Sequence, residues 1–397
     1  MFNLHLSPEQ LEIRDTVRDF VAREVKPVAL KPERLEPFAK PLLAAQLDQA
    51  SKLGLRTLAL SEAAGGAGAD NLTACIVTEE LAVGDPDIAA VLAHTAALGR
   101  LLERAMTPGQ RDRFFPPFVR DDAFHLALAS LEPGGGTALG IHYHRPQPEP
   151  RVGTVAGRNG GEWTLNGTKI AVPNAPLAKL FAVQASTAAG AGTLLVPRDA
   201  PGVSVRAQEG HWFHGSYGEV TFSNCRVPAD NLLGSGINTD WHGSPELQAL
   251  NLGVGRAAYE AALDYAHLRV QGGRPIIEHQ AIGAKLAGIA IKLEVARAAI
   301  WRAAWASDHP EAVADRSLPD LPLQTVAQVF TAEAMLAVAK DAAECFGAMG
   351  VMRDLPLQKY VHDARVCLHS GDGSADATLR LAEILAGYQR PAAKAVA

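Results

Sequence analysis

Apolar residues follow helical spacing at both ends of the chain and strand-like spacing in the middle. Residues 7–29 open with a serine and a proline that suit a helix start, and Leu11, Val17, Val21 and Val25 then recur at helical spacing. Further helical patterns cover residues 39–53, 71–83, 86–104 and 108–119. We therefore expect an N-terminal α-helical domain over residues 1–124.

Short apolar and β-branched runs bounded by Gly, Asn and Pro replace this pattern from about residue 125. They predict a middle β domain, a small barrel or sandwich, over residues 125–236. Within it, Asn166-Gly167 taken alone predicts a hairpin turn. Helical spacing returns near Leu247 and continues to Leu385, which predicts a C-terminal helical bundle over residues 237–397. The fold class is thus α+β, in the order α, β, α.

Composition excludes several classes of protein. Apolar residues make up 48% of the 397, charged residues 20%, and the formal net charge is −6, which is ordinary for a globular chain and argues against nucleic acid as a partner. The four cysteines form no CxxC pair, so neither a disulfide framework nor a thiolate metal site is expected. No apolar run approaches the roughly 20 residues of a membrane span, and the first residues do not resemble a signal peptide, so we expect a cytoplasmic protein.

Common catalytic motifs are absent from the sequence. It contains no GxxxxGK[ST] loop, no GxGxxG between a strand and a helix, no HExxH and no GxSxG. The close histidine pairs His142 and His144, and His211 and His214, have no adjacent carboxylate or cysteine, so we assign no metal.

Seven phrases stand in a fixed order along the chain: Glu79-Glu80-Leu81-Ala82, Thr107-Pro108-Gly109-Gln110-Arg111, Glu132-Pro133-Gly134, Leu165-Asn166-Gly167-Thr168-Lys169, Val227-Pro228-Ala229-Asp230-Asn231-Leu232-Leu233-Gly234, Tyr265-Ala266-His267-Leu268-Arg269-Val270-Gln271-Gly272-Gly273-Arg274-Pro275-Ile276 and His362-Asp363-Ala364-Arg365. In this order and at these intervals the chain resembles the acyl-CoA dehydrogenase family of flavoproteins, over roughly residues 7–388.

The resemblance implies a dimer or tetramer in which FAD lies between the middle β region and the C-terminal helices. A carboxylate takes the α-proton of an acyl-CoA, the β-hydride passes to the flavin, and an electron-transfer flavoprotein accepts the electrons. We therefore expect α,β-desaturation of an acyl-CoA thioester, with branched, cyclic or steroid-derived acyl groups as candidates, in fatty acid or steroid catabolism.

Several residues match cofactor-binding positions of that family. Arg269 corresponds to the arginine that reaches across the dimer interface to the FAD diphosphate, and Phe346, Gly347 and Gly350 belong to the turn that passes close to the neighbour's FAD. Glu132, Thr137 and Asn174 fall beside the flavin ring.

The flavin-ring region departs from the family pattern in two places. Leu131 stands where the family has a threonine, and Ala171-Val172-Pro173-Asn174 replaces Trp-Ile-Thr-Asn. Pro173 also lacks a backbone N–H.

The resemblance leaves two candidates for the catalytic base. Asp372 is the acidic residue in the stretch where most members keep their glutamate, although it aligns only if one residue is inserted. Glu246 lies three residues beyond the other family position and is held in reserve.

Two alternatives stay open beside the dehydrogenase. The chain is either an incomplete subunit that pairs with a homologous chain and lends Arg269 to that partner's FAD, or a flavoenzyme of this fold acting on a non-CoA substrate.

Overall fold

The computed structural model describes residues 5–35, 41–133, 153–209, 213–234, 244–318, 321–369 and 373–388. The N-terminal helices are α1 (Pro8–Phe20), α2 (Lys26–Ala29), α3 (Ala44–Lys52), α4 (Asn71–Gly84), α5 (Pro86–Ala105) and α6 (Pro108–Arg120), with a π-helical turn at Val21–Val25 and 3-10 turns at Pro32–Arg34 and Glu62–Ala64. Ser7 begins α1 with a capping box, since its hydroxyl accepts from the Gln10 backbone while the Gln10 side chain accepts from the Ser7 N–H. The predicted N-terminal helices are confirmed.

Seven strands form one mixed sheet in the order β1-β4-β2-β3-β7-β6, with β5 also paired to β4. The strands are β1 (His125–Ala129), β2 (Val155–Asn159), β3 (Glu162–Pro173), β4 (Ala178–Thr187), β5 (Gly190–Pro197), β6 (Val203–Ala207) and β7 (Tyr217–Pro228), followed by a 3-10 turn at Ala229–Asn231. The middle β region is confirmed, and its core is a separate cluster that includes Trp163, Phe181 and Phe222.

The hairpin turn predicted at Asn166-Gly167 is wrong. The β2–β3 turn lies at Gly160-Gly161, and Gly167 lies inside β3, where the register against β7 shifts. Gly167 has φ +150°, and a Cβ there would stand 2.6 Å from the Thr154 Cα. The glycine therefore serves a bulge and a close backbone approach.

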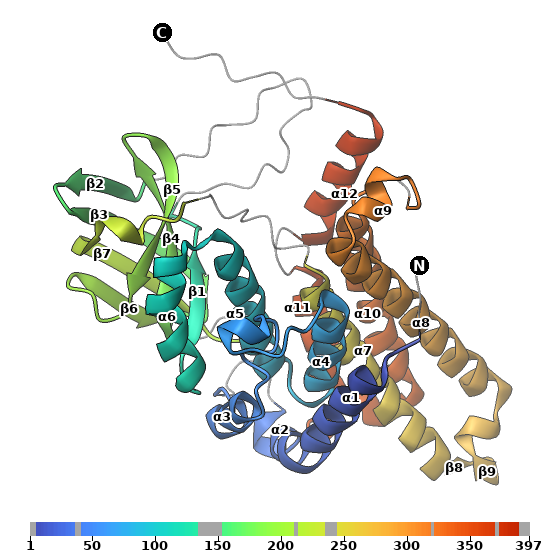
Figure 1. The fold of residues 1–397 in the computed structure, drawn as a ribbon. Helices are drawn as coiled ribbons and strands as arrows, with labels where there is room; N and C mark the ends of the chain where they lie inside the picture. Colours follow the sequence, from blue (N-terminus) through green and yellow to red (C-terminus); the bar gives the residue numbers. More distant parts are fainter. Residues whose placement is uncertain are drawn as a thin grey trace.

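The C-terminal part is a helical bundle. Its elements are α7 (Pro245–Leu268), β8 (Val270–Gln271), β9 (Arg274–Pro275), a 3-10 turn at Ile276–Glu278, α8 (Gln280–Asp308), α9 (Glu311–Ala314), α10 (Leu323–Cys345), a 3-10 turn at Gly347–Val351, α11 (Leu357–Leu368) and α12 (Gly373–Leu385). Figure 1 places this bundle on the right and the sheet on the left, with α5 in contact with both β1 and α7.

Helix α4 joins the N-terminal helices to the bundle. Glu79 on α4 accepts from Arg256 of α7 and Arg297 of α8, each at 2.7 Å, and Glu80 pairs with Arg18 of α1 at 2.7 Å. Both glutamates are at most 4% exposed, so each buried charge has a partner. The Glu79-Glu80 phrase therefore fixes α4 against three helices. The structure contains this α, β, α order, while the proposed domain limits at 124 and 236 stay a prediction.

Candidate functional site

Arg269 lies at the tip of the α7–α8 arm. Its backbone N–H donates to the Tyr265 carbonyl and its own carbonyl accepts from the Ile276 N–H, both at 2.8 Å, which closes the β8–β9 hairpin. The side chain is exposed and pairs with no other described residue. The guanidinium is thus available to an anion, as its predicted role requires.

The predicted glycine turn lies beside this arm. Phe346 stacks on Tyr265 of α7, with ring centroids 4.0 Å apart and planes 13° from parallel. Gly347 has φ +57° and open space around the position of a Cβ. A Cβ at Gly350 would stand 2.3 Å from the Ala343 carbonyl oxygen, so this position needs a glycine. The stack therefore brings the turn and the Arg269 end of α7 together.

Glu132 is paired within the sheet region. Its carboxylate accepts from the buried Lys169 ammonium at 2.6 Å and from the backbone N–H groups of Gly153 and Thr154. Burial alone would raise the pKa of Glu132, but these donors outweigh it and lower the pKa to about 2. Glu132 thus secures the end of β1 to β3, and its assignment to the cofactor stays a prediction.

Asn174 is buried and faces α5. Its amide nitrogen donates to the Val91 carbonyl at 3.0 Å and to the Thr95 hydroxyl at 3.1 Å, while its Oδ1 is buried without a hydrogen-bond partner. The residue has φ 62°, a left-handed conformation that asparagine tolerates better than most. Its amide group secures the end of β3 to α5, and its assignment to the flavin also stays a prediction.

Glu246 is buried in the first turn of α7, with 4% of its surface exposed. Its carboxylate accepts from Arg100 Nη1 of α5 at 3.1 Å, and Arg100 Nη2 is buried with no hydrogen-bond partner. Burial is the largest cause of the raised pKa of Cys75 on α4. The Glu246 carboxylate raises this pKa further, and the Arg100 guanidinium limits the rise. A desolvated carboxylate therefore lies in a seam between three helices.

The predicted residues do not form one cluster in a single chain. At 1.5 Å per residue, Glu246 and Arg269 stand about 35 Å apart along α7. Arg269 therefore does not reach a reaction centre at its own chain's Glu246, and its expected role across an interface stays a prediction. Thr137 and Asp372 lie outside the described residues.

Sequence reasoning missed several buried polar groups. His214 lies between α5 and α11, where its Nε2 donates to the Asp363 carbonyl at 3.1 Å and its Nδ1 faces the Asp87 carboxylate at 3.4 Å. The buried Lys359 pairs with Asp363 on α11. No local motif marks His214, because its partners Asp87 and Asp363 are distant in sequence. Lys359 and Asp363 are only four residues apart, and it is the burial of this pair that the sequence does not show. The described residues contain no cluster suited to a metal ion and no helix long and apolar enough to cross a membrane.

Known proteins match this architecture along its whole length. Family models for the N-terminal, middle and C-terminal domains of acyl-CoA dehydrogenase match residues 7–122, 127–225 and 242–382. An acyl-CoA dehydrogenase of Bacillus subtilis is 30% identical over 384 residues, covering 91% of this chain and 94% of its own. The human mitochondrial short-chain specific acyl-CoA dehydrogenase is 29% identical over 391 residues, covering 94% and 89%. The solved butyryl-CoA dehydrogenase of Megasphaera elsdenii superposes with a TM-score of 0.81 at 24% identity, covering 97% and 100%.

Helical N-terminal, middle β and helical C-terminal parts in this order form the architecture of a flavoprotein oxidoreductase. The chain belongs to the acyl-CoA dehydrogenase family. FAD is the cofactor of this family. These residues fit the diphosphate end of FAD, because the exposed Arg269 guanidinium pairs with no other described residue and stands near Gly347, which has open space around it.

Proposed function

We propose that the chain catalyses α,β-desaturation of an acyl-CoA thioester. The observation that carries the proposal is the match of all three parts of the chain to acyl-CoA dehydrogenase domains, and the buried carboxylate of Glu246 at the start of α7 is one candidate for the base that this reaction needs. Abstraction of an α-proton needs a carboxylate in a desolvated place, and the resemblance puts one of two base positions close to this residue. Asp372 remains the first candidate for the base, since protonation of Glu246 would cost it the ion pair with Arg100.

The residues then divide into two groups by task. Arg269, Phe346, Gly347 and Gly350 hold the diphosphate end of FAD in a partner copy, while Glu132, Thr137 and Asn174 shape the ring side of the chain's own site. When bound, FAD supplies the acceptor for the hydride that leaves the β-carbon. The base takes the α-proton of the thioester.

We assign the electrons to an electron-transfer flavoprotein and the chain to the cytoplasm. The acyl group belongs to the branched, cyclic or steroid-derived class in this proposal, because the side chains beside the flavin ring depart from the common pattern at Leu131 and Pro173.

A second function is an incomplete subunit that lends Arg269 to a homologous partner's FAD. It is favoured by the flavin-ring side of the chain, where Pro173 offers no N–H and the Asn174 amide donates to α5. A flavoenzyme of this fold acting on a non-CoA substrate is the remaining alternative.

The flavin-to-protein ratio of the purified chain, alone and with a homologous partner, separates these functions. We expect one FAD per chain alone, and loss of the flavin's visible absorbance on mixing with an acyl-CoA. Less than one FAD, rising to one per heterodimer, would replace the proposal with the incomplete subunit. Full flavin with no reduction by any acyl-CoA would favour the non-CoA substrate.

The base is identified by two substitutions that keep side-chain size. We expect Asp372→Asn to retain flavin while flavin reduction slows by roughly 10²–10⁴, the usual loss for a general base. Glu246→Gln serves as the comparison. Full loss in Glu246→Gln, with reduction retained in Asp372→Asn, would move the role to α7.

A further inference from the structure

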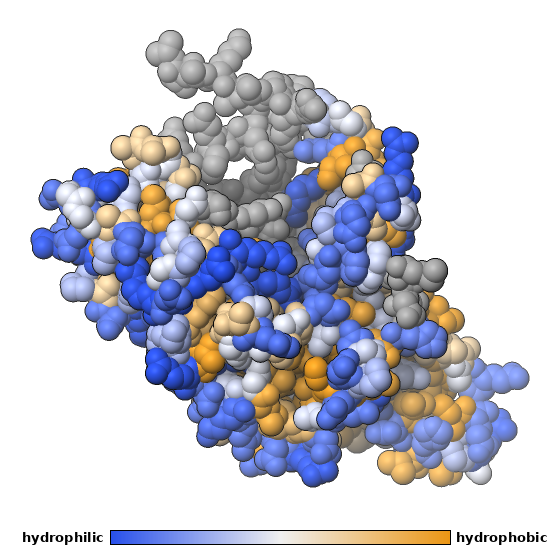
Figure 2. All heavy atoms as spheres, viewed as in Figure 1, coloured by the Kyte–Doolittle hydropathy of each residue, from blue (hydrophilic) through white to orange (hydrophobic). Residues whose placement is uncertain are grey.

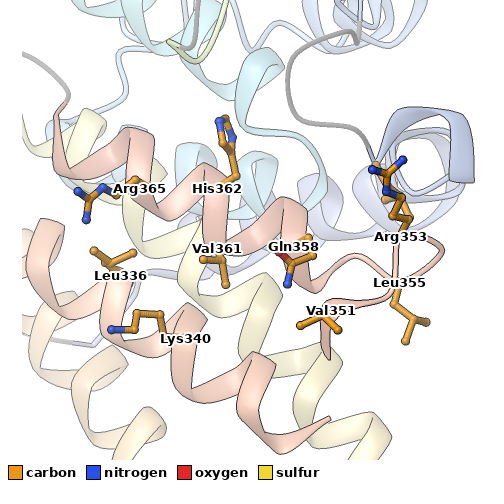
Figure 3. Close-up of a pocket in the computed structure, with 10 residues that line it drawn as sticks. Leu336, Lys340, Val351, Arg353, Leu355, Gln358, Val361, His362 and Arg365 are labelled. Atoms are coloured by element: carbon orange, nitrogen blue, oxygen red, sulfur yellow. The ribbon is translucent and has the colours of Figure 1, made fainter. Parts of the chain in front are cut away.

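The cavity between α10 and α11 adjoins the predicted cofactor turn. Its volume is about 670 Å³, and Gln358 in its wall donates to the Gly350 carbonyl at 2.7 Å (Figure 3). A separate cavity of about 770 Å³ lies between α6 and the sheet, and none of its lining residues is assigned above to FAD or to the base. Both volumes are within the range of small-molecule sites, but the second cavity is independent of the proposed cofactor contacts.

Apolar side chains make up much of the wall of this α6–sheet cavity. They are two phenylalanines, three prolines and a leucine, namely Phe114, Pro117, Phe124, Leu180, Pro197 and Pro228. Phe114 and Leu180 are buried in the core that packs α6 against the sheet, so a helix and a strand hold this part of the wall in place. The phenyl and pyrrolidine rings present broad faces without hydrogen-bonding groups. The wall therefore suits a ligand with a flat apolar body.

Three cations also line the cavity, and two of them are neutralised by carboxylates. Arg113 contacts the Asp230 carboxylate at 3.2 Å, and Lys179 contacts the Asp121 carboxylate at 2.5 Å. The third cation, Arg198, forms no ion pair within the described part of the chain. An anion that enters the cavity would therefore meet one uncompensated positive charge.

Main-chain carbonyls hold the exposed Arg198 guanidinium in place. Its Nη1 donates to the Ala175 carbonyl at 2.8 Å and to the Pro176 and Ala178 carbonyls at 3.2 Å, where β3 turns into β4. Its Nε and Nη2 donate to no residue that the structure describes. Because one nitrogen anchors the guanidinium, the other two donors form a preorganised fork, and this geometry matches a carboxylate.

Asp199 opposes an anion in this cavity, because its side chain also lines it. The Asp199 side chain is exposed, so water and salt screen its charge. A ligand with a single negative charge makes the Arg198 contact with the least repulsion from Asp199, whereas a phosphate or a dicarboxylate brings further negative charge towards it. The charges of the cavity thus favour a monoanion.

We propose that the α6–sheet cavity binds an aromatic monocarboxylic acid. The carboxylate of the ligand accepts from the Nε–Nη2 fork of Arg198, and its flat apolar body lies against Phe114 and Phe124. A ligand in this cavity contacts α6 and the sheet together, so it stabilises the packing of the N-terminal helices on the β region. The site is separate from the base and from the desaturation step.

Calorimetric titration of the purified full-length chain with cinnamate tests the site. The comparison ligands are cinnamamide, which has the same flat body without the charge, and acetate, which has the charge without the body. We expect cinnamate to bind about tenfold more tightly than either, because it alone makes both the charge-assisted contact and the apolar contact. The temperature of thermal unfolding should rise with the concentration of cinnamate.

Two substitutions change the charge of the cavity in opposite directions. Arg198→Gln should weaken the binding of cinnamate about tenfold and leave that of cinnamamide unchanged, and Asp199→Asn should strengthen the binding of cinnamate about two- to threefold. Arg206→Gln is the matched control, since Arg206 is an exposed arginine of β6 that pairs with Glu219 and does not line the cavity. It should bind cinnamate as the wild type does.

Equal binding of cinnamate and cinnamamide by the wild type overturns the site, as does equal weakening in Arg198→Gln and Arg206→Gln. Displacement of cinnamate by an acyl-CoA also overturns it, because the acid would then occupy the acyl site. Arg198→Gln removes the hydrogen bonds to the turn, so the acid–amide comparison and Asp199→Asn decide the question if that variant does not fold. Because flavin reduction by acyl-CoA is measured separately, failure of this site is distinct from failure of the proposed function.

Discussion

Two buried lysines of the described residues pair with carboxylates, one between segments distant in sequence and the other within α11. Lys169 of β3 is 0% exposed and pairs with Glu132, and Lys359 is 1% exposed and pairs with Asp363. A buried charge that loses its partner typically destabilises the fold by about 3–5 kcal/mol, whereas an exposed pair contributes about 0–1 kcal/mol.

We expect Glu132→Gln to lower the free energy of unfolding by about 3 kcal/mol, since it leaves the Lys169 ammonium buried without an anion. Urea denaturation measures the loss. Asp121→Asn is the matched control, because it removes the partner of the half-exposed Lys179 and should change stability by less than about 1 kcal/mol. Equal effects of the two substitutions would show that the Lys169 pair does not stabilise the sheet.

His214 gives the fold a dependence on pH. Burial opposes its charge, but the hydrogen bond to Asp87, followed by Cys367 and Asp363, raises its pKa to about 10. Because the folded pKa exceeds the ordinary value of 6.5, the stabilisation is complete below pH 6.5 and is lost as pH rises through 10. We expect the stability difference between wild type and His214→Gln, measured in urea, to be largest near pH 6 and to shrink towards pH 10. A difference that is constant with pH would mean that the ring is neutral in the folded state.

Arg269→Ala should weaken FAD retention in the site that the arginine serves. Loss of a charge-assisted phosphate contact costs on the order of 1.5–3 kcal/mol, so flavin loss on dilution should rise about ten- to a hundredfold. Fluorescence of released flavin measures it. Arg274→Ala, on the exposed β9 strand of the same hairpin, is the control. Unchanged retention would reduce Arg269 to a surface residue.

At the scale of elements, close helix packing explains a glycine that helix propensity would disfavour. A Cβ on Gly253 of α7 would stand 2.5 Å from the Glu79 carbonyl oxygen of α4, whereas Gly288 of α8 has nothing within 4 Å. Both lie inside helices, where alanine is favoured over glycine by about 1 kcal/mol. Only Gly253 needs to be a glycine, because any side chain there would collide with α4.

We expect Gly253→Ala to destabilise the protein by about 1–3 kcal/mol, because the added methyl group forces α4 and α7 apart. Gly288→Ala should instead stabilise it by about 0.5–1 kcal/mol. Thermal unfolding of the two variants gives the comparison. A gain in both would mean that α4 and α7 have room for the methyl group.

The helices were predictable because their sequence signals are local. The strand pairings of the sheet were less predictable, because they join segments that are distant in sequence. Caps such as Ser7 lie within three residues of the helix starts that they mark. The strands β1 and β6 lack such signals, and β1 is defined by parallel pairing with β4 about 50 residues away. Asn-Gly is common in both hairpin turns and β-bulges, so the sequence alone does not distinguish the two at Gly167. The close approach of Thr154 to Gly167 in the fold shows that this position is a bulge.

The candidate site was predictable only where the resemblance could place single residues. The stack of Phe346 on Tyr265 brings the turn at Gly347 to the Arg269 end of α7, while the cofactor roles of both stay a prediction. The Arg100–Glu246 pair was not predictable, since it depends on helices that meet only in the folded chain. Sequence spacing carries no information on such contacts.

At the scale of the whole molecule, the helical arm exposes apolar surface next to Arg269. Leu268 is 81% exposed and Val270 59%, on either side of Arg269, and Val351 is 71% exposed after the glycine turn. Figure 2 shows apolar surface at the lower right, over the end of α7 and the β8–β9 hairpin. Exposed apolar patches of this kind are typical of protein interfaces.

We therefore expect a dimer or tetramer, formed with a second copy or a homologous chain, in which the arm tip is buried. Sedimentation of the wild type should give a species larger than the monomer, and Leu268→Asp combined with Val270→Asp should shift it to smaller species, because burying two carboxylates in an apolar contact is unfavourable. Flavin loss should increase in the same variant, since Arg269 is then withdrawn from the partner's site. Val155→Asp, at a 54% exposed position of β2, is the control and should keep the assembly. A homogeneous monomer at micromolar concentration that retains one FAD per chain would contradict the interface. The reason is that Arg269 lies about 35 Å along α7 from its own Glu246, so it cannot complete a site there within one chain.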